Sequence, residues 1–218
     1  MADRELIYGR RPVAEAERGR RRVHQIWRTP ETTAEELTRL AGSPDHQGVV
    51  AEVDPYPYAD PAALLSDPSA LLVALDQVQD PRNLGAVCRS AEVAGAAGVV
   101  IPQRRAAAVT AVACKASAGA VEHLAVARAR NLADWLGEAR DAGFWVWGAD
   151  GGAPTAYTEA DLTGGTVLVL GGEGKGLRPR VAASCDGLLA IPQRGRTASL
   201  NVSAAAGVLL FEALRQRA

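Results

Sequence analysis

The sequence predicts an α/β protein built on a mostly parallel β-sheet, and two observations support this. From Leu71 onward, short apolar runs alternate with segments of helical character. Strands that are apolar on both faces are typical of parallel sheets, because the crossover helices cover both sides. The chain of 218 residues, 48% of them hydrophobic, is also long enough to bury one sizeable core beside a small second unit.

The expected elements alternate strictly along this region. The predicted strands are the apolar runs at 71–75, 98–102, 123–127, 144–148, 166–170 and 187–191. The predicted helices lie within 83–96, 108–120, 131–143 and 176–185, and a last helix covers 204–215. No internal repeat with a fixed period is present.

Three regions follow from composition. Residues 1–53 are predicted to form a small N-terminal unit, residues 54–70 a linker, and residues 71–218 the α/β domain. The linker is extended because it contains Pro55, Pro57, Pro61 and Pro68. The first thirty residues are rich in arginine although the whole chain has a net charge of −1. This local excess either indicates a polyanionic partner or is simply a solvated helix face.

Several classes of site are disfavoured by composition. The three cysteines and three histidines are scattered without metal-ligand spacing, so we expect no metal site and no disulfide framework. The N-terminus lacks the apolar run of a signal peptide, and no apolar stretch reaches membrane-spanning length. We therefore expect a cytoplasmic protein without a membrane partner.

Ligands of parallel α/β sheets bind where loops leave the carboxyl ends of the strands, and three such loops have unusual compositions. The loop "GGEGKGL" at 171–177 is not a P-loop, since Gly176 follows Lys175 where Ser or Thr is needed. Its glycines also miss the Rossmann spacing and follow the fifth strand rather than the first. The remaining interpretations are a close backbone approach to a ligand, with Glu173 in the middle, or a tight turn.

The other two loops carry polar residues beyond what helix capping needs. Asn83 stands at an expected helix start and could cap it, whereas Arg89 lies among small and apolar residues. Such an arginine is expected to pair with a carboxylate or a phosphate. Ser199, Asn201 and Ser203 alternate before the last helix, although one cap requires only one of them. This surplus favours a binding or catalytic site.

Together, the three loops resemble the three motifs of the SpoU (TrmH-like) ribose 2′-O-methyltransferases of the SPOUT superfamily. The resemblance covers Leu71 to Arg215. The first motif corresponds to Asn83, Gly85 and Arg89. The second and third motifs correspond to Gly171, Glu173, Gly174, Gly176 and Leu177, and to Ile191, Pro192, Gly195, Ser199, Leu200, Asn201, Val202 and Ser203. Each motif alone is weak, but all three in this order are highly specific.

The resemblance implies a deep trefoil knot at the C-terminus, a homodimer, and S-adenosyl-L-methionine as cofactor. By motif match, the cofactor contacts are Gly171, Gly172, Ile191, Gln193 and Leu200. The implied catalytic residues are Asn83, Arg89, Glu173, Ser199 and Asn201. Because a guanidinium is a very poor base, we expect Arg89 to hold a phosphate and polarise the ribose hydroxyl.

The N-terminal region is similar to the L30e-like substrate-binding domain of the rRNA-modifying branch, but it is shorter than usual. The expected function is therefore 2′-O-methylation of RNA, with a guanosine of 23S rRNA as the first candidate. Alternatives within the class are tRNA ribose methylation and antibiotic-resistance rRNA methylation. A catalytically silent RNA-binding or ribosome-assembly protein is the alternative from another class.

Overall fold

The computed structural model describes residues 4–172, 174, 176–196 and 199–218. The chain divides into two compact units that do not follow its order. The first unit contains the chain up to Pro57 together with Pro81–Arg89 and Ala108–His123, and the second contains Tyr58–Asp80, Ser90–Ala107 and Leu124–Ala218. Two later segments of the chain therefore belong to the unit that begins at the N-terminus.

The first unit is built around a three-stranded antiparallel sheet in the order β1-β3-β2. Its strands are β1 (Glu5–Tyr8), β2 (Val23–Arg28) and β3 (Val49–Val53), and its helices include α1 (Arg10–Ala16), α2 (Ala34–Ala41) and α4 (Ala111–Ala116). Thr33 caps α2 by accepting a hydrogen bond from the Glu36 amide, and Gly42 ends that helix in the left-handed conformation. Buried Tyr8, Leu37 and Val50 form a core cluster here.

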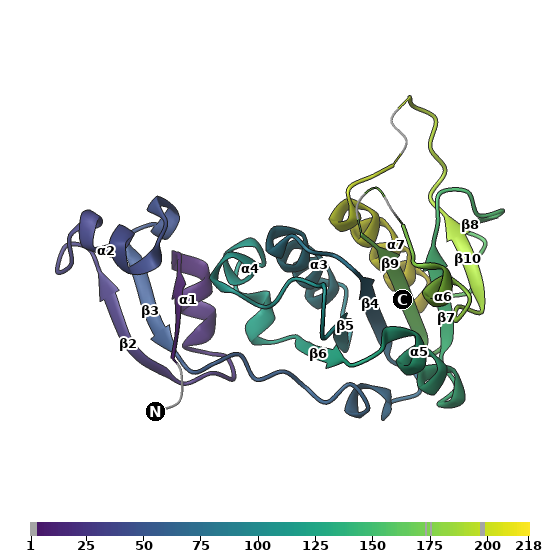
Figure 1. Cartoon of the computed structure of the whole chain (residues 1–218), viewed down its shortest axis with the longest axis horizontal. Coiled ribbons are helices and arrows are strands. Elements are labelled where there is room, and N and C mark those ends of the chain that lie inside the picture. The colour runs from purple at the N-terminus through teal and green to yellow at the C-terminus, as the bar shows by residue number, and fades with distance from the viewer. Residues whose placement is uncertain (1–3, 173, 175, 197–198) are drawn as a thin grey trace. The chain divides into compact units, whose positions relative to one another are not determined.

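The second unit contains a seven-stranded sheet in the order β6-β5-β4-β9-β7-β10-β8, and all of its strand pairs are parallel (Figure 1). Its strands are β4 (Leu71–Asp76), β5 (Gly98–Pro102), β6 (Ala125–Ala129), β7 (Trp145–Ala149), β8 (Thr155–Ala156), β9 (Thr166–Gly171) and β10 (Gly187–Ala190). Every residue of β4 and β5 is buried. Because neighbouring residues of a strand face opposite sides, both faces of the central sheet are covered.

Helices α5 (Leu132–Asp141), α6 (Pro179–Ala182) and α7 (Val202–Arg217) belong to the second unit, and α5 packs against β7 and α6. Helix α3 (Pro81–Val93) is divided, since its residues up to Arg89 cluster with the first unit. The main core gathers side chains of the sheet with Leu132, Trp135 and Leu136 of α5. Between Val53 and Leu71 the chain forms one short 3₁₀ turn, Ala63–Leu65, and an isolated bridge from Ala59 to Ala127.

The prediction of a parallel α/β sheet is confirmed, and five of the six predicted strands begin within one residue of the observed ones. The strand predicted at 123–127 instead spans Ala125–Ala129, because residues 120–122 form a 3₁₀ turn. This strand lies at the edge of the sheet and exposes Arg128, so its apolar run is interrupted. The two-residue strand β8 was not predicted.

Candidate functional site

A cavity of about 370 Å³ opens in the second unit, where loops leave the carboxyl ends of β7, β9 and β10. It lies within the volume range of small-molecule sites. Its lining includes all five residues that the sequence assigned to cofactor contact, together with Ser199. These five are Gly171, Gly172, Ile191, Gln193 and Leu200. The two later motifs thus meet around one cavity, with glycine backbone and aliphatic side chains in its wall.

The glycines at the end of β9 and in the loop after it are required by close backbone packing or by backbone conformation. A Cβ atom on Gly171 would lie 2.1 Å from the Gly176 carbonyl carbon, and one on Gly172 would lie 2.6 Å from the Gln77 carbonyl oxygen. Gly174 and Gly176 have φ angles of 77° and 61°, which favour glycine. The Gly172 amide donates to the Asp76 carbonyl at 2.8 Å, and the Gly176 amide to the Gly172 carbonyl at 3.2 Å. At Gly171 and Gly172 the wall of the cavity is therefore close-packed backbone.

Asp76, which was not predicted as a site residue, holds the end of this loop in place through Arg178. Its carboxylate is completely buried at the end of β4 and accepts hydrogen bonds from the Arg178 amide at 2.8 Å and from Arg178 Nε at 2.7 Å. The contact fixes the chain directly after the glycine loop to the neighbouring strand. An acidic residue at the end of a wholly apolar strand was the available signal, because a buried carboxylate requires a partner.

The third motif contains the cap that the sequence predicted. Asn201 is the N-cap of α7, and its Oδ1 accepts from the Ser203 amide at 2.8 Å and from Ser203 Oγ at 2.6 Å. The polar residues of the motif that are not the cap itself therefore have different places: Ser203 hydrogen-bonds to the capping Asn201, whereas Ser199 lines the cavity. Leu200 is 43% exposed and lines the same cavity.

The first motif lies on α3, in the segment that belongs to the first unit. Asn83 is the third residue of α3, which begins at Pro81. The Asn83 side chain is nearly buried and Arg89 is exposed. All described residues that line the cavity belong to the second unit. Asn83 and Arg89 belong to the first unit and are not among them. The predicted residue Glu173 lies outside the described residues.

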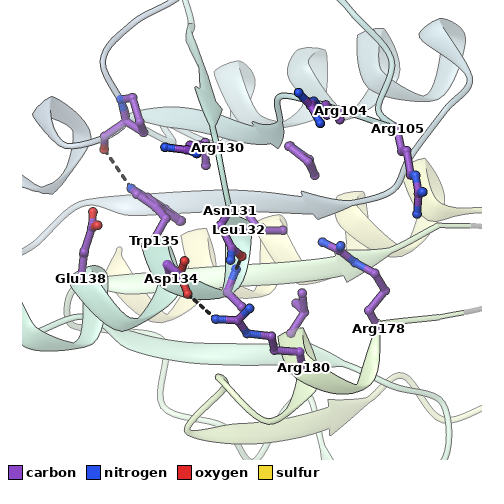
Figure 2. Close-up of a pocket in the computed structure, with 15 residues that line it drawn as sticks. Arg104, Arg105, Arg130, Asn131, Leu132, Asp134, Trp135, Glu138, Arg178 and Arg180 are labelled. Atoms are coloured by element: carbon purple, nitrogen blue, oxygen red, sulfur yellow. Dashed lines mark hydrogen bonds and ion pairs between the residues drawn. The ribbon is translucent and has the colours of Figure 1, made fainter.

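A second, larger cavity of about 890 Å³ lies in the second unit and is lined by five arginines. They are Arg104, Arg105, Arg130, Arg178 and Arg180. Figure 2 shows the first three on one side of the cavity and the last two on the other. This group was not predicted from the sequence, although the neighbouring pair Arg104 and Arg105, separated by one residue from the strand at 98–102, was a visible signal.

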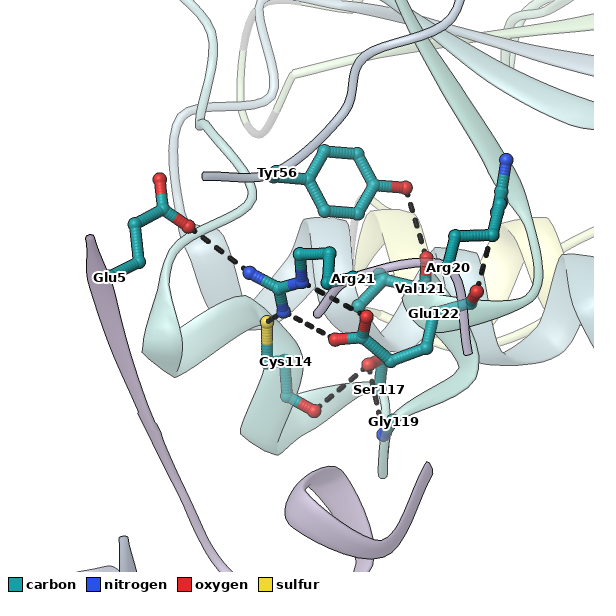
Figure 3. A network of polar contacts seen from close by, with 9 residues as sticks. All are labelled: Glu5, Arg20, Arg21, Tyr56, Cys114, Ser117, Gly119, Val121 and Glu122. Atoms are coloured by element: carbon teal, nitrogen blue, oxygen red, sulfur yellow. Dashed lines mark hydrogen bonds and ion pairs between the residues drawn. The ribbon is translucent and has the colours of Figure 1, made fainter. Parts of the chain in front are cut away.

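The first unit contains a buried ionic network around Arg21 (Figure 3). Arg21 and Glu122 each expose 1% of their side chains and form two hydrogen bonds, and Arg21 also contacts Glu5 at 3.1 Å and Cys114 Sγ at 3.3 Å. Burial acts to lower the pKa of Arg21, but Glu122 and Cys114 outweigh it and leave the pKa raised. Burial raises the pKa of the Cys114 thiol to about 11 despite the nearby guanidinium.

Within the described part of the chain, no group of three or more His, Cys, Asp or Glu side chains is arranged to hold a metal ion. Across the same residues, none of the helices combines the length and apolar character needed to cross a membrane.

The fold and the first cavity define a class of protein: parallel α/β proteins with a glycine-walled ligand cavity at the carboxyl edge of the sheet. Residues 70–211 match the model of the SpoU rRNA Methylase family. The chain belongs to this family.

Relatives and solved structures agree with this membership. An uncharacterized tRNA/rRNA methyltransferase of Mycolicibacterium gilvum is 50% identical over 192 residues, which cover 86% of this chain and 61% of the relative. This chain thus aligns with about three fifths of that relative's length. The SpoU methyltransferase AviRb from Streptomyces viridochromogenes, in complex with the cofactor AdoMet, superposes with a TM-score of 0.81 at 28% identity, covering 97% of this chain and 89% of AviRb.

A second structure, an RNA 2′-O ribose methyltransferase, superposes with a TM-score of 0.84 at 27% identity, covering 99% of this chain and 90% of the other. Both superpositions include nearly the whole chain. The α/β fold with its parallel sheet is therefore that of SpoU methyltransferase structures.

Proposed function

We propose that this protein methylates a ribose 2′-hydroxyl in RNA with S-adenosylmethionine as cofactor, and that its first candidate target is a guanosine of 23S rRNA. The observation that carries the proposal is the first cavity. It unites the second and third sequence motifs, including every residue assigned to cofactor contact. Two related structures add support, since one holds AdoMet and the other is an RNA 2′-O ribose methyltransferase.

The residues of the cavity fit this cofactor. Its volume of about 370 Å³ suits a nucleoside-sized molecule, and its wall offers backbone groups at Gly171 and Gly172. Leu170, Leu189 and Ile191 supply apolar surface for a purine ring. When bound, S-adenosylmethionine supplies an electrophilic methyl group.

The protein's own contribution to such a reaction is alignment and electrostatic stabilisation. An in-line displacement depends strongly on how the acceptor oxygen is positioned. Arg89 is exposed and permanently charged, so its proposed role is to hold the phosphate beside the target ribose and polarise the hydroxyl. Because Asn201 Oδ1 is engaged by Ser203, Asn201 would act on the ribose as an amide donor, beside Ser199. Asn83 and Glu173 complete the proposed set through their motif positions.

The same proposal includes a cytoplasmic homodimer and a trefoil knot in the region of β9, β10 and α7. The exposure of Phe211 (48%) and Leu214 (39%) on α7 supports self-association, because a helix in a monomer rarely leaves two large apolar side chains on one face. The first unit, which contains the N-terminal residues, is proposed to bind RNA. A cavity of about 580 Å³ in the first unit supports this role, since Arg10, Arg11 and Lys115 line it.

The test is incubation with labelled S-adenosylmethionine and unmodified rRNA or tRNA, followed by mapping of ribose methylation. We expect label on a 2′-oxygen of 23S rRNA. If label is found only on tRNA, the proposed substrate is wrong and tRNA is the substrate instead. No incorporation into any RNA, with cofactor binding intact, would favour a catalytically silent RNA-binding protein.

A further inference from the structure

We propose that the five-arginine cavity binds phosphates of the RNA strand next to the target nucleotide. This inference rests on the proposed function, because it assigns a second contact surface to the same substrate. The cavity is distinct from the proposed cofactor site, since the two share no lining residue among those described.

The charge of the lining favours a polyanion. Five arginines line the cavity, and the acidic residues in the lining are Asp134 and Glu138. The whole chain, in contrast, has a net charge of −1. Positive charge concentrated in a concave surface focuses the electrostatic potential and attracts negatively charged ligands. Phosphate groups are the ligands that arginine recognises best, through paired hydrogen bonds.

Three of the arginines are available for such contacts. Arg104, Arg105 and Arg130 are exposed, and none has a carboxylate within salt-bridge distance among the described residues. Arg180 pairs with Asp134 at 2.6 Å, but both side chains are more than half exposed. Such an exposed pair is weak and can be exchanged for a phosphate at little cost. Arg178 is held by buried Asp76 and forms the fixed edge of the cavity.

The position of the cavity fits a strand that also reaches the cofactor site. Arg104 and Arg130 follow the carboxyl ends of β5 and β6, so they lie at the same edge of the sheet as the glycine loop. Gly174 and Gly176 line the first cavity, and Arg178, two residues after Gly176, lines the second. The segment 176–178 therefore runs from the lining of the first cavity to the lining of the second. A strand with its ribose at the first would place neighbouring phosphates at the second.

Backbone conformation gives a further indication. Arg105 has a φ angle of 59°, in the left-handed region that non-glycine residues rarely adopt. This conformation costs roughly 1 kcal/mol or more, and such outliers cluster at functional sites. Here the outlier is one of the arginines that line the cavity (Figure 2).

The test measures RNA binding directly on the whole 218-residue chain. The probe is a fluorescein-labelled, mixed-sequence single-stranded RNA of about 20 nucleotides, titrated at several salt concentrations with fluorescence anisotropy. In R104Q/R130Q we expect about tenfold weaker binding and a slope of log Kd against log salt that is shallower by roughly 1.4, for two lost phosphate contacts. The matched control R128Q/R140Q removes two exposed arginines of the same unit that do not line the cavity. It should keep the parent's slope.

The inference is overturned if the two double variants bind RNA equally, or if R104Q/R130Q weakens binding without changing the salt slope. Thermal unfolding of each variant verifies that the fold is kept. Methyl transfer by the parent protein is measured separately. A parent that methylates RNA while R104Q/R130Q binds like the control would refute the arginine site alone. A parent that methylates no RNA would refute the proposed function, whatever the binding experiment shows.

Discussion

Asp76 and Asn201 show how single polar side chains build the first cavity. Asp76 is fully buried and holds Arg178, so it fixes the end of the glycine loop. Asn201 uses one oxygen to accept two hydrogen bonds from Ser203, and thereby starts α7 beside Leu200. In both cases a side chain that hydrogen-bonds to nearby backbone also fixes the position of a neighbouring part of the motif: the glycine loop for Asp76 and the start of α7 for Asn201. Mutations at either position would therefore disturb the site through its support.

Arg89 is the residue whose substitution tests the proposed mechanism. We expect Arg89→Ala to lower the rate of methyl transfer by about 10²–10³, because it removes charge stabilisation at the reacting centre. Cofactor affinity, measured by calorimetry, should stay within about twofold of the parent. Arg140→Ala, which also removes an exposed arginine, serves as control. Near-parental activity of Arg89→Ala would show that the assignment is wrong.

Arg21 gives a stability prediction in the first unit. Arg21→Met leaves the carboxylate of Glu122 buried without its partner, so we expect the free energy of unfolding to fall by about 3–5 kcal/mol. Denaturant titration measures the change. The double variant Arg21→Met/Glu122→Leu removes both charges and should recover most of the loss. Arg39→Met, whose exposed pair with Glu36 spans 3.9 Å, should cost less than about 0.5 kcal/mol.

At the scale of elements, apolar runs predicted strands well because the central strands are buried on both faces. The same criterion misplaced β6, where an edge position allows Arg128 to face solvent. It also gave no strand of the first unit, in which β2 mixes half-buried and exposed residues and gains its order from pairing with β3. Capping rules located the start of α7 at Asn201, whereas α3 begins at Pro81, two residues before the helix start expected at Asn83.

The candidate site was predictable to the extent that backbone chemistry determines it. Glycines and a short polar loop mark two candidate loops in the sequence, and the resemblance to the SpoU motifs named the five expected cofactor contacts, all of which line one cavity. The arginine cavity was not predictable in this way. Arg104, Arg130 and Arg180 are far apart in the chain, and only the order of the strands brings them together.

Two helical glycines give a matched pair of predictions at this scale. A Cβ atom on Gly85 of α3 would lie 2.4 Å from the Ala113 carbonyl oxygen and 2.7 Å from the Ala116 Cβ. Gly85→Ala should therefore cost about 1–3 kcal/mol through overpacking. Gly137 of α5 has open space at the same position, so Gly137→Ala should stabilise the protein by about 0.5–1 kcal/mol. Thermal and denaturant unfolding would measure both, and equal effects would contradict the described α3–α4 packing.

At the scale of the whole molecule, the proposed dimer can be measured directly. Light scattering at micromolar concentration should give twice the chain mass of 22.8 kDa. Phe211→Asp/Leu214→Asp places two charges on the exposed apolar face of α7 and should shift the protein toward the monomer. Glu35→Gln/Glu138→Gln, two exposed positions on other helices, provides the control. A monomeric parent would contradict the dimer.

The order of the large sheet has a consequence for how the protein is made on the ribosome. Strand β7 pairs with β9 and β10, and both are translated after it. Strand β4 likewise keeps one edge open until β9 emerges. During synthesis the nascent chain therefore carries two apolar strands with unpaired backbone groups, a state that is prone to aggregation. Pairing between strands that are far apart in the chain slows folding. We therefore expect the nascent chain to fold slowly and to need chaperones.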